Sequence, residues 1–149
     1  MDSVMFRSLQ QEVDAFKQWA SGVTEKRGEW ETEYLEWNSI YNAAQSVIGD
    51  TSLEDWNAAV YELVLYSLAR DNEVENILQM QVQHPEVLVA VANKALAYTD
   101  SEARWQIAHA LGEIEGRNEE SIYLLSRFSE DNVEYVRRRA LAALGRRQR

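Results

Sequence analysis

The feature that most constrains this sequence is an internal repeat with a period of 33 residues. Shifting the chain by this period superposes residues 103–112 on residues 136–145, matches Arg104 with Arg137, and aligns the Ala-Leu-Gly triplets that close both segments. Both segments carry apolar residues at helical spacing. Repeats of this length fold as helical hairpins that stack on their neighbours, because one hairpin cannot bury its apolar face alone.

The rest of the chain also favours helices. Its 149 residues include one proline and six glycines, and apolar spacings of three and four leave little room for a sheet. Glycines, Pro85 and the capping pairs Ser52/Asp55 and Thr99/Glu102 mark helix ends. These signals predict about eight helices, at residues 3–20, 29–48, 53–70, 73–83, 85–98, 100–112, 119–129 and 131–145. Their short connections predict antiparallel neighbours.

Residues 129–145, an acidic turn followed by Val136-Arg137 and a helix rich in alanine and leucine, resemble the HEAT family. The resemblance is in particular to the short repeats found in bacterial HEAT-repeat proteins and in phycobilin lyases. The resemblance implies an all-α fold, a right-handed α-solenoid of antiparallel helical hairpins whose second helices line a concave binding surface. We expect a single domain over 1–149, with 1–83 as diverged helices or a cap and HEAT-like repeats at 84–146.

Residue types and motifs argue against several functions. The absence of cysteine removes disulfides, thiolate metal sites and a cysteine nucleophile, and fits a reducing compartment. With no run of 18 apolar residues and no export signal, we expect a cytoplasmic protein without a membrane partner. The sequence has neither a glycine-rich phosphate loop nor the strained serine turn of hydrolases. We therefore expect no enzymatic activity and no cofactor.

Charge is spread unevenly along the chain, whose net charge is -10. Residues 1–133 hold 24 acids and nine bases, whereas the last sixteen residues hold six arginines and one acid. An acidic body repels nucleic acid and attracts a basic protein, although the charge could also serve only to keep the protein in solution. The arginine-rich end is interpreted as structural, because cations stabilise a helix C-terminus and Arg104 and Arg137 belong to the repeat.

Four aromatic residues in the predicted second helix share one face and are interpreted as core. They are Trp30, Tyr34, Trp37 and Tyr41. Four acids alternate with them, namely Glu29, Glu31, Glu33 and Glu36. The opposite face is therefore acidic, and Glu29, Glu33 and Glu36 are candidate contacts for a basic partner. A solvated helix face is the alternative.

A second candidate contact surface centres on Trp105, which occupies the repeat position held by Arg138 in the last copy. We expect Trp105 to lie outside the core and to act as an aromatic anchor, unless an adjacent helix covers it. The polar residues proposed to surround this anchor are Gln106 and His109, together with Glu102 and Glu113.

His109 and Glu113 have the i, i+4 spacing of two metal ligands on one helix. The chain has only one other histidine, His84, and no cysteine. We therefore predict a hydrogen bond between His109 and Glu113 and no metal site.

These observations suggest a non-catalytic protein-binding module. Within that class we favour a bacterial immunity protein that binds and neutralises a basic toxin nuclease domain, because the chain is small, acidic and free of catalytic motifs. The alternatives are a phycobilin-lyase-like accessory protein or enzyme that holds a tetrapyrrole, and a general HEAT-repeat scaffold.

Overall fold

The computed structural model describes residues 3–116 and 118–147, and no strand occurs among them. They form the α-helices α1 (Val4–Ser21), α2 (Trp37–Asp50), α3 (Ala58–Arg70), α4 (Asn76–Val82), α5 (Pro85–Ala95), α6 (Ser101–Leu111), α7 (Glu119–Phe128) and α8 (Glu134–Arg147). Two short 3-10 segments, η1 (Trp30–Glu33) and η2 (Leu53–Asp55), precede α2 and α3. The prediction of an all-α fold with about eight helices is confirmed for the described residues.

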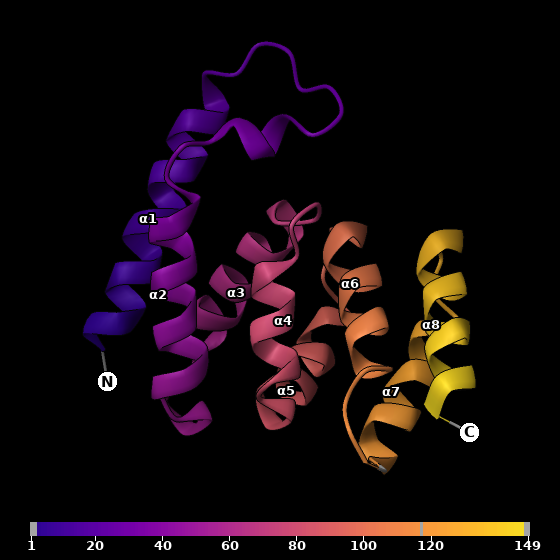
Figure 1. Cartoon of the computed structure of the whole chain (residues 1–149). Coiled ribbons are helices and arrows are strands. Elements are labelled where there is room, and N and C mark those ends of the chain that lie inside the picture. The colour runs from indigo at the N-terminus through magenta and orange to yellow at the C-terminus, as the bar shows by residue number, and fades with distance from the viewer. Residues whose placement is uncertain (1–2, 117, 148–149) are drawn as a thin grey trace. The chain divides into compact units, whose positions relative to one another are not determined.

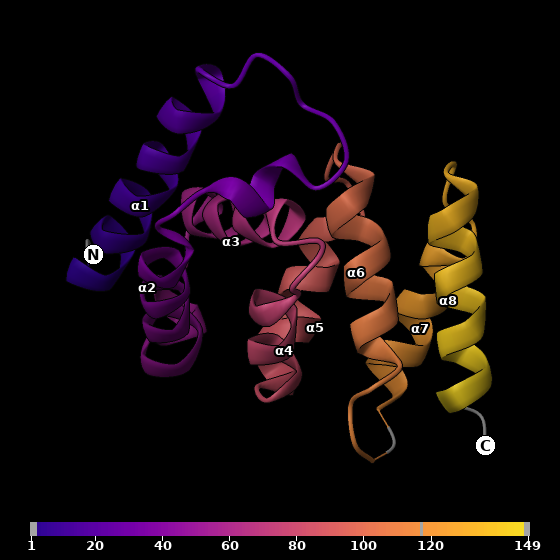
Figure 2. The same ribbon diagram turned by 45° about the horizontal axis from the view of Figure 1, so that its top comes forward.

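Contacts within the chain define two compact units, Met1–Ile77 and Leu78–Arg149, called unit 1 and unit 2 below. In unit 1, α1 and α2 lie side by side and run in opposite directions, and α3 packs against α1 (Figure 1). In unit 2, α6 and α8 lie side by side, and α5 and α7 pack against them (Figures 1 and 2). Helix α4 crosses the boundary between the units.

Several helix ends lie where the sequence predicts them. The Ser3 hydroxyl accepts a hydrogen bond from the Met5 amide at 3.1 Å and begins α1, which ends before Gly22. Pro85 opens α5, where its missing N–H has no intrahelical partner to lose. Asn118 caps α7 by accepting a hydrogen bond from the Ser121 amide at 2.9 Å.

The predicted helix at 29–48 is wrong in its first third. Residues 30–33 form η1, Tyr34 is extended, and α2 begins only at Trp37 and passes Gly49 to end at Asp50. Tertiary bonds hold this irregular path, because buried Glu31 pairs with Arg70 at 3.2 Å and its carbonyl accepts from the Trp37 indole at 2.8 Å. The four aromatic residues therefore do not lie on one helix.

Two predicted capping boxes are shifted. Ser52 begins only the short segment η2, and the side chain of Asn57 caps α3 by accepting from the Val60 amide at 3.1 Å. Asp100, rather than Thr99, caps α6. Asp100 is a stronger N-cap than Thr99, whereas Asn57 lies five residues after Ser52 and is about as strong an N-cap as serine.

Two further helix ends also differ from the prediction. Helix α4 begins at Asn76 rather than residue 73, because Glu75 has a φ of 61°, which a right-handed helix cannot contain. Helix α8 continues through Gly145 to Arg147, so this glycine does not end the helix.

The core of unit 1 is a cluster of aromatic rings around Phe16, which is 1% exposed. Its ring centroid lies 5.1 Å from that of Tyr34 and 5.3 Å from that of Trp37. Trp19 and Trp30 stack beside it with centroids 6.0 Å apart. The interpretation of the four predicted aromatic residues as core is confirmed for Tyr34, which is 8% exposed, whereas Trp30, Trp37 and Tyr41 pack in or beside the cluster but stay partly exposed.

The repeat arginines hold the hairpins of unit 2. Arg104 and Arg137 each donate to the carbonyl oxygen six residues earlier, to Tyr98 at 2.7 Å and to Asp131 at 2.8 Å. Arg104 also makes a buried ion pair with the Asp131 carboxylate at 2.8 Å. The same carboxylate accepts from the Val133 amide at 2.9 Å. Asp131 thus joins α6 to the turn between α7 and α8.

Replacing Asp131 by alanine is predicted to lower the free energy of unfolding by about 3–5 kcal/mol, because Arg104 would keep its charge in a buried position without its partner. Urea denaturation followed by circular dichroism measures this change. Glu134→Ala is the control, since its pair with Arg138 is exposed at 3.9 Å and should contribute at most ~0.5 kcal/mol. Equal losses in the two variants would contradict the role assigned to Asp131.

The repeat-equivalent glycines Gly112 and Gly145 are predicted to respond oppositely to alanine. A Cβ at Gly112 would lie 2.9 Å from the Cα of Ala143 in α8, whereas one at Gly145 meets nothing within 4 Å. Gly112→Ala should destabilise by about 1–3 kcal/mol through overpacking. Gly145→Ala should be neutral or stabilise by up to ~1 kcal/mol, because alanine favours a helix interior. Thermal unfolding of both variants tests the pair, and a stable Gly112→Ala protein would refute the close approach.

Candidate functional site

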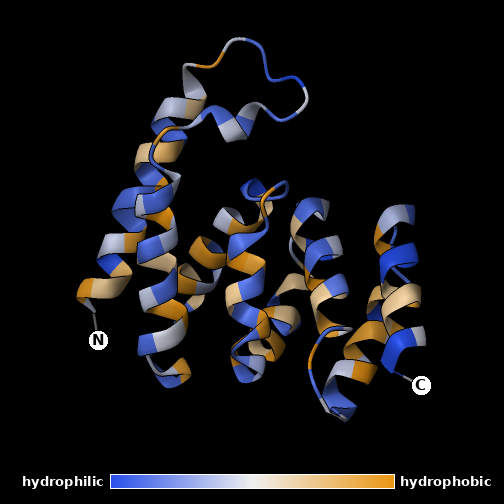
Figure 3. Cartoon of the chain, in the orientation of Figure 1, coloured by the Kyte–Doolittle hydropathy of each residue, from blue (hydrophilic) through white to orange (hydrophobic). Residues whose placement is uncertain are grey.

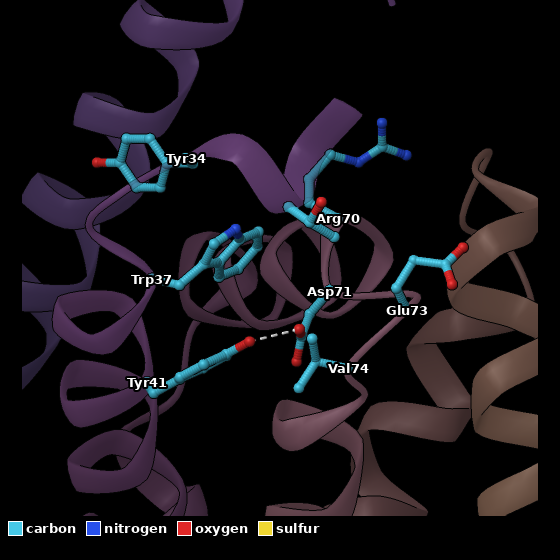
Figure 4. Close-up of a pocket in the computed structure, with 8 residues that line it drawn as sticks. Tyr34, Trp37, Tyr41, Arg70, Asp71, Glu73 and Val74 are labelled. Carbon is cyan, nitrogen blue, oxygen red and sulfur yellow. Dashed lines mark hydrogen bonds between the residues drawn. The ribbon is translucent and has the colours of Figure 1, made fainter. Parts of the chain in front are cut away.

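Unit 1 contains a cavity of about 250 Å³ between α2 and the turn that follows α3 (Figure 4). Aromatic side chains form one wall and charged residues the other. The lining residues are Thr32, Tyr34, Trp37, Tyr41, Arg70, Asp71, Glu73 and Val74. We refer to this cavity as the aromatic pocket.

The aromatic wall comes from α2 and the extended residue before it. Trp37 and Tyr41 lie one turn apart and project from α2 toward the turn after α3, and their rings stack at 5.5 Å with 26° between their planes (Figure 4). Tyr34 meets the edge of Trp37 at 6.2 Å. The hydrogen bond from Trp37 to the Glu31 carbonyl orients its indole, so the wall is held rigidly.

Asp71 forms the polar end of the pocket and is 3% exposed. Its carboxylate accepts from the Tyr41 hydroxyl at 2.7 Å and from the Ile77 amide at 3.0 Å. Burial raises the pKa of Asp71 above its ordinary value, and the bonds from Ile77 and Tyr41 partly oppose this shift. The pKa of Tyr41 is raised by burial and by its bond to Asp71.

The surroundings of the pocket are strongly acidic. Unit 1 contains 15 acidic and five basic residues, whereas unit 2 contains ten of each, so the net charge of -10 belongs to unit 1. Burial raises the pKa of Tyr34, and the negative charges of Glu12 and Glu36 raise it further. The loop between α1 and η1 is mostly hydrophilic (Figure 3).

The predicted acidic contacts lie beside this pocket. Glu29, Glu33 and Glu36 are exposed, and the last two flank Tyr34 in the chain. Glu31, the fourth acid of that segment, is buried and paired with Arg70. One glutamate of the segment is therefore structural, and the other three face solvent. This arrangement arises because the backbone of the segment is irregular and does not form one helical face.

The predicted contacts around Trp105 lie on α6 in unit 2. Trp105 is partly covered by α8, because its ring meets Tyr135 edge-on at 5.3 Å and the Arg139 guanidinium lies 5.2 Å from its centroid. Its indole donates to the Glu102 carboxylate at 2.7 Å. Gln106 is fully buried, unlike the surface position expected for it, and donates to the Glu102 carbonyl at 3.0 Å.

The remaining residues of that surface pair with one another. His109 and Glu113 are joined at 2.7 Å, which confirms the predicted hydrogen bond, and Arg146 of α8 donates to the His109 carbonyl at 3.3 Å. Arg147 donates to the carbonyls of Ile114 and Gly116. The arginines at the end of α8 thus bind groups at and beyond the end of α6, in agreement with the structural interpretation of the basic segment.

Sequence reasoning missed the charged wall of the pocket. Arg70 and Asp71 are the last residue and the C-cap of an ordinary helix, and Val74 lies in a polar turn, so no local pattern marks them. Their proximity to Trp37 and Tyr41 arises from tertiary structure alone, across 30 residues between Tyr41 and Asp71.

Residues 3–116 and 118–147 contain no group of three or more histidine, aspartate or glutamate side chains arranged to hold a metal ion. Among the same residues, none of the helices is both long enough and apolar enough to cross a membrane.

Paired helices joined by repeat arginines define a helical-repeat scaffold. A family model of HEAT repeats matches residues 51–145, and the chain belongs to this family. The matched stretch begins before the 84–146 region in which the repeat was recognised from sequence, and it includes α3 and α4. No curated protein and no solved structure matches the chain. HEAT repeats commonly mediate protein–protein interaction, so this chain falls in a class of interaction scaffolds.

Tyr41→Phe is predicted to lower the free energy of unfolding at neutral pH by about 1–2 kcal/mol, because buried Asp71 would lose a hydrogen-bond donor. The pKa of Asp71, already above its ordinary value of 3.8, should rise further. When the pKa of a carboxyl group is higher in the folded protein than in the unfolded chain, the free energy of unfolding falls as the pH rises from the lower pKa to the higher one. The destabilisation caused by Tyr41→Phe should therefore be smaller in acid, where Asp71 is protonated in both states. Urea denaturation across pH and carboxyl NMR measure both effects.

Tyr123→Phe is the control for this variant. Tyr123 is exposed in unit 2, and its hydroxyl contacts only an exposed arginine, Arg127 at 3.1 Å, among the hydrogen bonds of the described residues. An unchanged Asp71 titration in Tyr41→Phe would contradict the coupling between the two side chains.

Proposed function

We propose that this HEAT-repeat scaffold binds a basic protein through unit 1, and that it is a bacterial immunity protein that neutralises a toxin nuclease domain. The observation that carries the proposal is the division of charge, since unit 1 holds the net charge of -10 and unit 2 is neutral. An acidic surface of this strength steers a basic partner and accelerates its association at low salt.

A nuclease domain is a suitable partner because its substrate cleft must attract phosphate and is therefore basic. Glu29, Glu33 and Glu36 present carboxylates to solvent from one short segment, where they can replace substrate phosphates. Leu35 is 93% exposed among them and adds apolar contact area. The α6 surface around Trp105 is less suited to a basic partner, because arginines of α8 accompany its glutamates.

The size of the aromatic pocket argues against a tetrapyrrole bound in this pocket. Sites for drug-sized ligands usually enclose roughly 300–1,000 Å³. The aromatic pocket encloses about 250 Å³, which suits a side chain better than a bilin.

The proposal is tested by affinity capture at low salt, followed by nuclease assays on the captured protein. We expect recovery of one basic protein whose nuclease activity falls to background at a one-to-one ratio. The triple variant Glu29→Lys/Glu33→Lys/Glu36→Lys should weaken this binding by roughly tenfold or more, since close charge pairs across an interface couple by ~1.5 kcal/mol or above.

The matched control is Glu115→Lys/Glu130→Lys/Glu134→Lys, which makes the same change in net charge on exposed positions of unit 2. Both triples include one acid at the start of a helix, Glu36 for α2 and Glu134 for α8. Equal weakening by both triples would assign the effect to net charge alone. A captured protein that remains fully active in the complex would rule out the immunity role.

A further inference from the structure

We propose that the aromatic pocket of unit 1 receives an arginine side chain of the protein partner. This inference rests on the proposed function, because it gives the basic partner a specific residue and a specific site. The inference concerns a single site, because binding of the arginine would depend on the pocket and not on the exposed glutamates.

The ring faces of Trp37 and Tyr41 are suited to a planar cation. Both rings line the pocket, and guanidinium groups stack on aromatic faces more readily than ammonium groups do. The Tyr41 hydroxyl donates to the Asp71 carboxylate at 2.7 Å, which increases the electron density of the phenol ring. The pair is therefore preorganised for a positive charge.

The same aromatic cluster already binds cations of unit 1 at its other edges. The Lys17 ammonium lies 4.6 Å from the centroid of Tyr66, and the Lys26 ammonium lies 5.4 Å from that of Trp30. Two of the five basic residues of the unit thus rest on ring faces. Trp37 and Tyr41 are rings of this cluster that line an open cavity.

The charges of the pocket also favour a cation over an anion. Arg70 is a positive group in the lining, but its guanidinium is held by Glu31 at 3.2 Å. Asp71 and Glu73 add two carboxylates to the same lining. The Glu73 side chain points away from the rings in Figure 4, so it contributes through its field and not through contact.

The rim of the pocket offers apolar surface for the methylene groups of an arginine side chain. Val74 lines the pocket and is 56% exposed, so it offers apolar surface at the opening. The methylene groups of arginine bury well against such apolar surface while the guanidinium meets the rings. A cavity of about 250 Å³ open at one apolar edge therefore matches one long basic side chain.

The test is an NMR titration of the full chain with N-acetyl-arginine amide, observed at the indole resonance of Trp37, which the Trp37→Phe variant assigns. We expect a saturable shift, with an affinity at least roughly fivefold weaker for N-acetyl-citrulline amide, the uncharged isostere, and also weaker for the lysine amide. Equal affinity for citrulline or for lysine, or no saturable shift with arginine, would overturn the proposal.

Two exposed valines supply matched variants. Val74→Lys places a positive charge at the rim and should abolish the arginine-dependent shift, whereas Val4→Lys makes the same change in α1, at a valine that is 71% exposed, and should preserve it. Loss of the shift in both variants would attribute binding to the general charge of unit 1 and refute the site. The titration needs no partner protein, so its failure leaves the capture experiment unaffected.

Discussion

The structure of unit 2 depends on one buried ion pair, between Arg104 and Asp131. A helical hairpin cannot bury its apolar face alone. The neighbouring hairpin must therefore be held at a fixed register to cover that face. The bond at 2.8 Å between Arg104 and Asp131 sets this register, and the bond from Arg104 to the Tyr98 carbonyl ties the same side chain to its own turn. The Arg104 and Asp131 side chains are 8% and 9% exposed, so removing either partner would leave a largely buried charge unpaired.

In unit 1, aromatic rings rather than arginine side chains hold the helices together. Phe16 is surrounded by rings from α1, η1 and α2, and the buried pair of Glu31 with Arg70 is the polar contact that holds the irregular segment. This difference has an electrostatic consequence. The arginines of unit 2 neutralise its acids, whereas unit 1 is built with few basic residues and keeps its negative charge. The surface suited to a basic partner is therefore the one stabilised by rings.

The sequence was a good guide where structure is local or periodic. The helix ends at Ser3, Gly22, Pro85 and Asn118, and the repeat arginines, were all accessible from spacing and capping chemistry. The prediction weakened where tertiary bonds override propensity. Residues 30–36 contain good helix formers, yet burying Glu31 against Arg70 and extending Tyr34 over Phe16 outweigh the helical preference. Half of the pocket lining comes from Arg70, Asp71, Glu73 and Val74, about 30 residues after Tyr41 in the chain.

The break in this helix also explains why a pocket exists. On a continuous helix, Trp30, Tyr34, Trp37 and Tyr41 would form one stripe and pack together against α1. The extended residue Tyr34 instead turns toward Phe16, and Trp30 stacks on Trp19, so Trp37 and Tyr41 keep ring surface toward the turn after α3. Asp71 lines the same pocket and accepts a hydrogen bond from the Tyr41 hydroxyl. A local loss of regular structure thus turns residues with a core-forming pattern into the wall of an open pocket.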